Sequence, residues 1–281
     1  MNKQISLIIP TYGRYEEVGK LLETLKNQDC NKDDFEVIIV DQNDKIDLTP
    51  ITNLYLNELN LIHYKTPVKG IANAKNKGIE LSSAPNITFP DDDCTYYPNT
   101  ITIALNFLKS RPDADVVYGR LYDRDARKNI MRSWPVFEKQ VTIFNFHYTY
   151  SAITAFIRKN AIRFDTNFGV GSSYGVGEEL DYLLQTFKLK LNSIYTPLID
   201  IWHPQINPDV MTPEKVYYYA KGYGAICKKH LSFIMFFTFL TSNLFQILQI
   251  VKSLLLFNNK FAYKRWLALK GRIVGFNSFK S

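Results

Sequence analysis

The sequence lacks any cysteine pattern that could support disulfides or a structural zinc site. Its three cysteines, Cys30, Cys94 and Cys227, are widely spaced and form no CxxC pair. Such sparse use excludes a disulfide framework and favours a reducing compartment. The N-terminus also lacks a signal-peptide pattern, because only about six apolar-rich residues follow its first four residues. We therefore expect a cytoplasmic protein.

Glycine-rich loops that hold phosphates are also missing. The first apolar run, residues 5–9, leads into Pro10-Thr11-Tyr12-Gly13-Arg14 rather than GxGxxG, and no Walker A lysine motif occurs. A dinucleotide fold holds its pyrophosphate on a glycine-rich helix N-terminus, so that device is excluded here. If a nucleotide diphosphate binds, another group must neutralise it, and a metal ion is the natural candidate.

Acidic residues are absent from the last quarter of the chain. From Lys215 to Ser281 there are eleven Lys or Arg residues and no Asp or Glu, which leaves 23 of the 34 basic residues against 27 acidic ones in residues 1–214. The body is therefore mildly acidic and the tail strongly basic. This asymmetry predicts that the tail meets a polyanion, either a nucleic acid or an anionic membrane.

Buried-type apolar runs alternate with helical patterns over the first half of the chain. This alternation predicts an α/β fold, with a mostly parallel sheet and helices on both faces. Ligands of such sheets bind beyond the carboxyl ends of the strands. Strands are predicted at 5–9, 35–40, 59–64, 86–89, 114–118, 151–158 and 194–202, and helices at 18–25, 71–81, 99–108 and 178–188.

The tail begins with a helix start at Thr212-Pro213-Glu214, with threonine as the cap and proline at the first helical position. Residues 231–257 are very apolar, yet five polar side chains recur there at helical spacing. A narrow polar stripe opposite a wide apolar face, with basic residues at both ends, predicts a helix in the membrane interface. Packing on the domain itself and a true membrane span stay open. The stripe consists of Thr238, Ser242, Gln246, Gln249 and Ser253.

Three consecutive aspartates, Asp91, Asp92 and Asp93, follow the predicted strand at 86–89. Three adjacent carboxylates repel one another unless a cation or solvent compensates them. Hard oxygen ligands of this kind suit Mg2+ or Mn2+. The alternative is an acidic turn or helix cap.

Asp41, at the end of the second strand, could accept hydrogen bonds from a base or ribose, or could belong to a turn.

Five motifs follow one another along about residues 4–204. They are Ser6 to Arg14, Val40-Asp41, Lys69 to Gly78, Phe89 to Asp93, and Gly177 to Asp181. Each motif alone is weak, but five in this order are specific, and together they resemble the family-2 glycosyltransferases of GT-A fold. The resemblance implies transfer of a sugar from a nucleotide-sugar, with inversion at the anomeric carbon, as in bacterial surface-polysaccharide assembly.

The resemblance also implies roles for individual residues. Asp41 would bind the base or ribose, and Lys75, where the family usually has arginine, would lie near the uracil or diphosphate. Asp93 would be the main metal ligand, helped by Asp91 and by His203, for Mn2+ or Mg2+. The nucleotide-sugar pocket would be lined by Pro10, Thr11, Tyr12, Arg14, Asp41, Lys75, Asp91 and Asp92.

Glu178-Glu179 matches the family's Glu-Asp pair, whose second member is the usual catalytic base. Here that member is glutamate, which lengthens the reach by one methylene and leaves the choice between Glu179 and Glu178 open. Inverting displacement needs such a carboxylate to deprotonate the acceptor hydroxyl. First-turn carboxylates also complement a helix dipole, which is the structural alternative. Asp181 could cap or orient the same helix.

We therefore predict a GT-A catalytic domain over residues 1–210 and a basic helical tail over 211–281. The nucleotide-sugar half would cover about 1–118 and the acceptor half about 119–210. The expected partners are a nucleotide-sugar, UDP-sugar foremost, a glycan or lipid-linked acceptor, and the inner face of the cytoplasmic membrane, with no nucleic acid. The alternatives are a sugar-phosphate nucleotidyltransferase and a basic nucleic-acid-binding protein.

Overall fold

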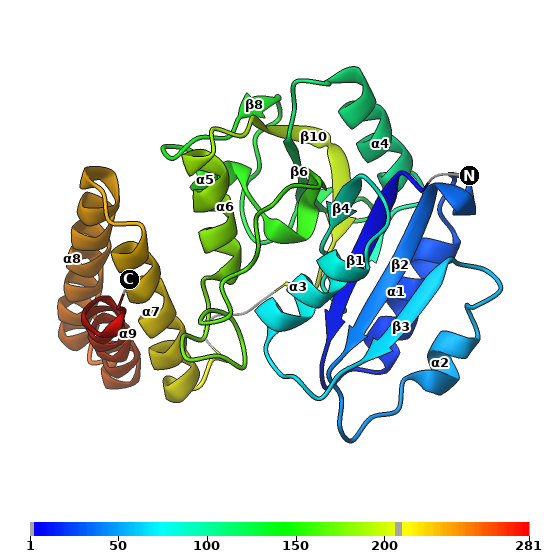
Figure 1. Ribbon diagram of the computed structural model, residues 1–281. Helices are drawn as coiled ribbons and strands as arrows, with labels where there is room; N and C mark the ends of the chain where they lie inside the picture. The colour runs from blue at the N-terminus through cyan, green and yellow to red at the C-terminus, as the bar shows by residue number, and fades with distance from the viewer. Residues whose placement is uncertain (1–2, 206–209, 281) are drawn as a thin grey trace. The chain divides into compact units, whose positions relative to one another are not determined.

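A computed structural model of the protein describes residues 3–205 and 210–280. The chain forms two compact units. Unit 1 consists of Met1–Arg163 and Gln185–Ile206, and unit 2 of Phe164–Leu184 and Asn207–Ser281. Unit 1 contains the sheet and unit 2 the C-terminal helices (Figure 1). The functional boundary predicted near residue 210 stays a prediction.

Unit 1 is built on a mixed sheet whose main path runs β3-β2-β1-β4-β9-β6-β10-β5, with β7 paired to β6 and β8 paired to β10. Neighbours on this path that are distant in sequence are brought together by crossovers, as in other α/β folds. The strands are β1 (Ile5–Thr11), β2 (Phe35–Asp41), β3 (Leu61–Lys65), β4 (Asn86–Thr88), β5 (Thr95–Tyr96), β6 (Val116–Asp123), β7 (Lys128–Asn129), β8 (Lys139–Gln140), β9 (Ala155–Arg158) and β10 (Ser193–Trp202).

The first half of the sheet is parallel, as predicted. β1 pairs in parallel with β2 and with β4, and β2 pairs in parallel with β3. Thr11 is the register partner of Asp41, so the carboxyl ends of β1 and β2 lie level. β9 then enters between β4 and β6 and is antiparallel to both, which makes the sheet mixed. β6 and β10 restore a parallel pair.

Helices flank this sheet on both faces, with α1 and α3 on opposite sides of β1 and β2 (Figure 1). α1 buries one apolar stripe, Val18, Leu21, Leu22 and Leu25, against the core. Such a stripe at helical spacing is what directs a surface helix onto a sheet. The helices of this part of the chain are α1 (Glu16–Lys26), α2 (Thr49–Asn53), α3 (Ile71–Leu81), α4 (Thr100–Ser110), α5 (Phe146–Thr149) and α6 (Glu178–Lys188), with 3-10 turns η1 (Lys32–Asp34) and η2 (Ala152–Thr154).

Unit 2 contains three long helices, α7 (Pro213–Lys229), α8 (Phe233–Leu255) and α9 (Asn259–Ser278) (Figure 1). α7 begins at the predicted start, where the Thr212 hydroxyl accepts a hydrogen bond from the backbone N–H of Lys215. α7 and α9 approach closely through glycines. A Cβ on Gly275 would lie 1.9 Å from the Lys221 carbonyl oxygen, and one on Gly224 would lie 2.0 Å from the Arg272 carbonyl oxygen.

α8 exposes its apolar face and turns its polar stripe toward the protein. Gln246 and Ser253 of the stripe are buried, as is the neighbouring Asn243, and the other three stripe residues are half-buried, whereas most of the large apolar side chains are exposed. Among residues 3–205 and 210–280, α8 is the one helix that is long and apolar enough to cross a membrane, with a mean hydropathy of 1.6. The exposed apolar side chains of α8 are Phe233, Ile234, Phe236, Phe237, Leu240, Leu244, Phe245, Ile247, Leu248, Val251, Leu254 and Leu255.

Candidate active site

The aspartate triplet lies just past β4 and meets the end of β1. The Thr11 hydroxyl, on the last residue of β1, donates a hydrogen bond of 2.7 Å to Asp92 Oδ2. Thr11 is itself buried. Because β1 and β4 are parallel neighbours, their carboxyl ends open on the same edge of the sheet, where ligands of α/β folds bind. The predicted position of the carboxylate cluster is therefore observed.

Arg14 fixes two of the three carboxylates. Its Nε lies 3.0 Å from Asp92 Oδ1 and its Nη2 lies 2.8 Å from Asp93 Oδ2. A planar guanidinium can hold two carboxylates at once through separate N–H groups. Arg14 lies in the short loop between β1 and α1, so this loop brings a positive charge to the carboxylate cluster.

His203 approaches the same cluster from the end of β10. Its Nε2 lies 3.2 Å from Asp93 Oδ1 and 3.6 Å from Asp91 Oδ2, while its Nδ1 lies 2.6 Å from the Pro204 carbonyl oxygen. A carbonyl only accepts hydrogen bonds, so Nδ1 carries a proton and Nε2 is the nitrogen that faces the carboxylates. His203 is buried, so its ring is held in place.

Burial and charge shift the pKa values of this cluster in different directions. Burial lowers the pKa of His203, but contacts with Asp91 and Asp93 outweigh it and raise that pKa to about 10. For Asp93, burial is opposed by His203 and Arg14, and its pKa is lowered. For Asp92, burial dominates over Thr11 and Arg14 and raises the pKa to about 6. The site therefore holds positively charged groups, His203 and Arg14, next to negatively charged carboxylates.

Asp91, Asp93 and His203 together can hold a metal ion. Each offers one ligand atom, and these three atoms lie within 4.8 Å of one another. Two carboxylates and an imidazole are a donor set that suits Mn2+, whereas Mg2+ prefers oxygen ligands alone. A cation would take the place of the proton on His203 Nε2, because a metal-bound imidazole is neutral. The predicted ligand residues thus fit a divalent cation.

Asp41 is fully buried at the end of β2 and already accepts three hydrogen bonds. Two come from the backbone N–H and side-chain amide of Asn43, each at 2.8 Å, and His63 Nε2 lies 3.0 Å from its other oxygen. The Asn43 contacts form the turn that the sequence left as an alternative. His63, on β3, was not singled out from the sequence, since nothing in its local pattern marks it. The role of Asp41 toward a nucleotide stays a prediction.

Tyr12 lies in the loop that follows β1, and Lys75 lies on α3. Tyr12 is exposed, and Lys69 Nζ lies 4.7 Å from the centre of its ring. Lys69 also donates a hydrogen bond to the Gln42 carbonyl oxygen, so it links the loops after β1 and β2. Lys75 is almost completely buried on α3. Pro10 is the buried residue before Thr11 in β1. Their roles in nucleotide binding stay predictions.

Glu178 and Glu179 lie in unit 2, at the first turn of α6. Glu178 is buried and Glu179 half-buried. Gly177, just before them, has a φ of +122°, which a residue with a side chain rarely adopts. A Cβ there would also lie 2.6 Å from Ile226 Cγ1, so only glycine fits this helix start. The assignment of the base to either glutamate stays a prediction.

Asp181, one turn further along α6, forms a buried ion-pair cluster with the end of α7. Its Oδ1 lies 2.8 Å from Lys229 Nζ and 2.6 Å from His230 Nε2. Lys229 Nζ also lies 2.7 Å from Asp165 Oδ2. Lys229 and His230 are separated from Asp181 by almost fifty residues of sequence, and no local pattern identifies them as its partners. The orienting role suggested for Asp181 has a structural basis in this cluster.

Comparison with solved structures shows the fold. Staphylococcus aureus TarS residues 1–349, in complex with UDP-GlcNAc, aligns with a TM-score of 0.63 at 18% identity and covers 98% of this chain and 91% of that chain. The mannosyltransferase PcManGT from Pyrobaculum calidifontis, in complex with GDP-Man and Mn2+, aligns with a TM-score of 0.57 at 12% identity, over 98% and 74%. The fold is the predicted GT-A fold.

Sequence comparison then gives the family. Residues 6–175 match the glycosyl transferase family 2 domain. The chain belongs to this family, as predicted, and is a glycosyltransferase by class. Staphylococcus aureus TarP, a poly(ribitol-phosphate) beta-N-acetylglucosaminyltransferase, is 25% identical over 175 residues, which are 58% of this chain and 53% of TarP. The chain spans about half the length of this relative and less of some others.

Proposed function

We propose that the protein transfers a sugar from a nucleotide-diphospho-sugar to a glycan or lipid-linked acceptor, with inversion at the anomeric carbon. The observation that carries this proposal is the cluster of Asp91, Asp93 and His203 at the carboxyl ends of β1 and β4. Such a cluster can hold a cation against a diphosphate. A UDP-sugar is the proposed donor, in keeping with the UDP-GlcNAc complex of TarS.

A divalent cation, Mn2+ or Mg2+, would be held by Asp93 and Asp91 with His203, and would stabilise the charge of the departing diphosphate. Arg14 orients two of the carboxylates and brings a fixed positive charge to the same place. The buried carboxylate of Asp41 would accept hydrogen bonds from the base or ribose. These residues therefore bind and orient the donor.

A carboxylate of unit 2 would take the proton from the acceptor hydroxyl. Glu179 is the first choice because it matches the second position of the family's acidic pair, and Glu178 is the alternative. A well-placed general base contributes a factor of about 100 to 10,000 in rate. Donor binding thus depends on unit 1 and proton removal on unit 2.

Release of the nucleoside diphosphate and transfer to a glycan acceptor test this proposal. The assay uses UDP-, GDP- and dTDP-sugars with Mn2+ or Mg2+. Asp93→Asn should weaken donor binding, and Glu179→Gln should lower kcat by about 100-fold or more with little change in donor affinity. Glu178→Gln, measured in parallel, decides between the two glutamates. If Asp93→Asn and Glu179→Gln both leave transfer intact, the assignment is wrong.

Glu80→Gln is the matched control for these variants. Glu80 is an exposed carboxylate on α3 that pairs with Lys77. Its replacement removes the same charge as the site variants do and should leave donor binding and kcat unchanged. The anomeric configuration of the product, read from the NMR coupling constant of its anomeric proton, tests inversion separately. Retention would contradict the proposed single displacement.

We also propose that the tail holds the protein at the inner face of the cytoplasmic membrane. This proposal is supported by the exposed apolar face of α8 and by the absence of Asp and Glu from Lys215 to Ser281. A tail of this kind would bind an anionic membrane interface both by burying its apolar face and by electrostatic attraction of its basic residues. A lipid-linked acceptor would be found in the same place.

Sedimentation with lipid vesicles tests the membrane proposal. The triple variant Phe237→Gln/Leu244→Gln/Leu248→Gln changes side chains that are each at least half exposed, so it should fold normally and lose vesicle binding. Residues 237, 244 and 248 are spaced by seven and four and share one helix face. A wild-type protein that stays in the supernatant with every vesicle composition would overturn the proposal. A dimer in light scattering would indicate that a second copy covers the face instead.

A further inference from the structure

Unit 2 contains a cavity where α8 ends and α9 begins. Its volume is about 610 Å³. The last two turns of α8 contribute Gln249 and Lys252, and the start of α9 contributes Lys260, Phe261 and Lys264. Since one water molecule occupies about 30 Å³ in the liquid, the cavity has room for on the order of 20 waters, or for a polar headgroup.

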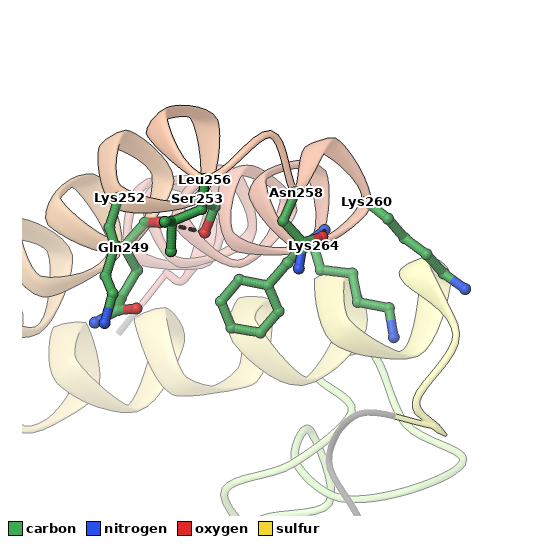
Figure 2. Close-up of a pocket in the computed structure, with 8 residues that line it drawn as sticks. Gln249, Lys252, Ser253, Leu256, Asn258, Lys260 and Lys264 are labelled. Carbon is green, nitrogen blue, oxygen red and sulfur yellow. Dashed lines mark hydrogen bonds between the residues drawn. The ribbon is translucent and has the colours of Figure 1, made fainter.

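Three lysines from two helices line this one cavity. Figure 2 shows Lys252 on one side of the cavity and Lys260 and Lys264 on the other, with Asn258 between them. Gathering three positive charges is unfavourable unless an anion joins them. From Lys215 to Ser281 the sequence contains no Asp or Glu, so the cavity lies in a strongly basic part of the chain.

The N-terminus of α9 opens on the same cavity. Asn258 caps it by accepting a hydrogen bond of 3.1 Å from the backbone N–H of Phe261. A helix of 20 residues carries a partial positive charge at this end, which adds to the charge of the lysines. The expected ligand group is therefore an oxyanion with several acceptor oxygens, such as a phosphate.

The exposed apolar face of α8 continues to the edge of the cavity. Leu256 lines the cavity and is exposed, and the neighbouring Leu255 and Phe257 are more exposed still. A ligand that combines a phosphate with hydrocarbon chains can satisfy both surfaces at once, whereas a free phosphate can satisfy only the lysines. Lysines beside an apolar interfacial helix are a common arrangement for binding anionic lipid headgroups.

We propose that this cavity binds the phosphate headgroup of an anionic membrane lipid, with Lys252, Lys260 and Lys264 as its ligands. The inference rests on the proposed membrane location of the tail and deepens it. The apolar face of α8 supplies attachment that is independent of headgroup charge. The three-lysine cavity adds selectivity for lipids whose whole headgroup carries a net negative charge. The enzyme would therefore concentrate on anionic regions of the bilayer.

Binding to two kinds of vesicle tests the proposal on the full-length protein. One kind is phosphatidylcholine alone, and the other contains equal amounts of phosphatidylcholine and phosphatidylglycerol. The cavity variant is Lys252→Gln/Lys260→Gln/Lys264→Gln. It should lose roughly a hundredfold of its affinity for the anionic vesicles, from about 1 kcal/mol for each of the three lysines, and keep its affinity for the neutral ones.

The matched control is Lys215→Gln/Lys270→Gln/Lys280→Gln, which removes the same charge from outside the cavity. Lys215 and Lys270 lie over the rings of Tyr219 and Trp266. The control should retain most of the preference for anionic vesicles. An equal loss in both triple variants would overturn the proposal, because the lysines would then act only as spread charge. Circular dichroism checks that both variants keep the helical content of the wild type.

A soluble probe separates the cavity from the membrane location as a whole. Dihexanoyl-phosphatidylglycerol below its micelle concentration should raise the melting temperature of the wild type and not that of the cavity variant, by mass action. Equal stabilisation by inorganic phosphate would identify a free anion as the ligand and overturn the lipid assignment. If the short-chain lipid stabilises the wild type but no vesicle is bound, the membrane location fails and the headgroup site stands.

Discussion

Lys229 connects α6 to the end of α7, and replacing it should destabilise unit 2. Its Nζ lies 2.8 Å from Asp181 Oδ1 and 2.7 Å from Asp165 Oδ2. The Asp181 carboxylate is fully buried, and His230 Nε2 lies 2.6 Å from the same oxygen. Lys229→Met keeps the length of the side chain but removes its charge. The buried carboxylate then loses one of the two basic groups that contact it.

The expected loss can be bounded from this geometry. Two unit charges 2.8 Å apart attract by about 6 kcal/mol at an effective dielectric constant of 20, and desolvation offsets much of that. Removing one partner of a buried pair costs about 3–5 kcal/mol, because the other charge stays buried. Lys229 is partly open to solvent and His230 remains, so we expect about 3 kcal/mol.

A double-mutant cycle with Asp181→Asn measures the interaction itself. Free energies of unfolding come from urea titrations followed by circular dichroism and by intrinsic tryptophan fluorescence, to which Trp266 contributes from unit 2 and Trp134 and Trp202 from unit 1. Residues in direct contact of this kind typically couple by about 0.5–3 kcal/mol, and we expect a value in the upper half of that range. A coupling energy below about 0.5 kcal/mol would refute the reasoning.

Lys228→Met is the control for this cycle. Lys228 is the preceding residue of α7, and its Nζ lies 5.3 Å from the centre of the Phe276 ring. A cation over an aromatic ring is worth about 0.5–1 kcal/mol at an exposed site, so the control should lose no more than that. If both lysine variants lose the same stability, the effect arises from the end of α7 in general and not from Asp181.

Two further predictions concern the core of unit 1. Burial opposes ionisation of Glu36, but hydrogen bonds from Lys3, Ser6 and Ser83 lower its pKa to about 2. A carboxyl group with a lowered pKa stabilises the fold above its ordinary pKa of 4.5, and this stabilisation is lost as the pH falls toward 2. Glu36→Gln should therefore cost about 2 kcal/mol at pH 7 and little at pH 2. A loss of stability in urea titrations that does not depend on pH would contradict this. Gly78→Ala would place a Cβ 2.1 Å from Ile8 Cγ2, so overpacking of about 1–3 kcal/mol should exceed the gain in helix propensity; a raised melting temperature would contradict this.

Local periodicity was sufficient to predict most elements of unit 1. α3 has the predicted bounds, and so does α6, most of which lies in unit 2. The strand predicted at 151–158 was only half right. Its first part forms the 3-10 turn Ala152–Thr154, and β9 begins at Ala155. The antiparallel insertion of β9 between β4 and β6 depends on long-range pairing, which a single sequence does not encode locally.

The candidate site was predictable where its residues lie at strand ends. Thr11 ends β1, Arg14 follows it, and the aspartates follow β4; because β1 and β4 pair, these side chains meet. His63 and Lys229 were missed for the opposite reason. Each contacts a predicted residue from a distant element, and neither has a sequence neighbour that marks it. Sequence patterns therefore identified the residues at the carboxyl ends of strands better than the distant side chains that orient them.

α9 falls within the helical tail predicted over 211–281, but the sequence did not give its bounds, because α9 packs through glycines rather than through an apolar stripe. Gly271 and Gly275 lie against the backbone of α7, where a larger residue would clash with Tyr217 and Lys221. Glycine lowers helix propensity by about 1 kcal/mol per residue, so two glycines argue against a helix when the sequence is read alone. Close approach of α7 and α9 compensates for that loss, and such a compensation is visible only in the packed structure.

The orientation of α8 shows the limit of amphipathic patterns most directly. A pattern identifies two faces of a helix but not the solvent that each face meets. In α8 the polar face is inside, and Asn243 Oδ1 and Gln246 Oε1 are buried without a hydrogen-bond partner among the described residues. Each large apolar side chain left in water forgoes about 1.5–3 kcal/mol of burial energy. With a dozen such side chains exposed, this face favours contact with an apolar surface, and the proposed membrane location would supply lipid for it.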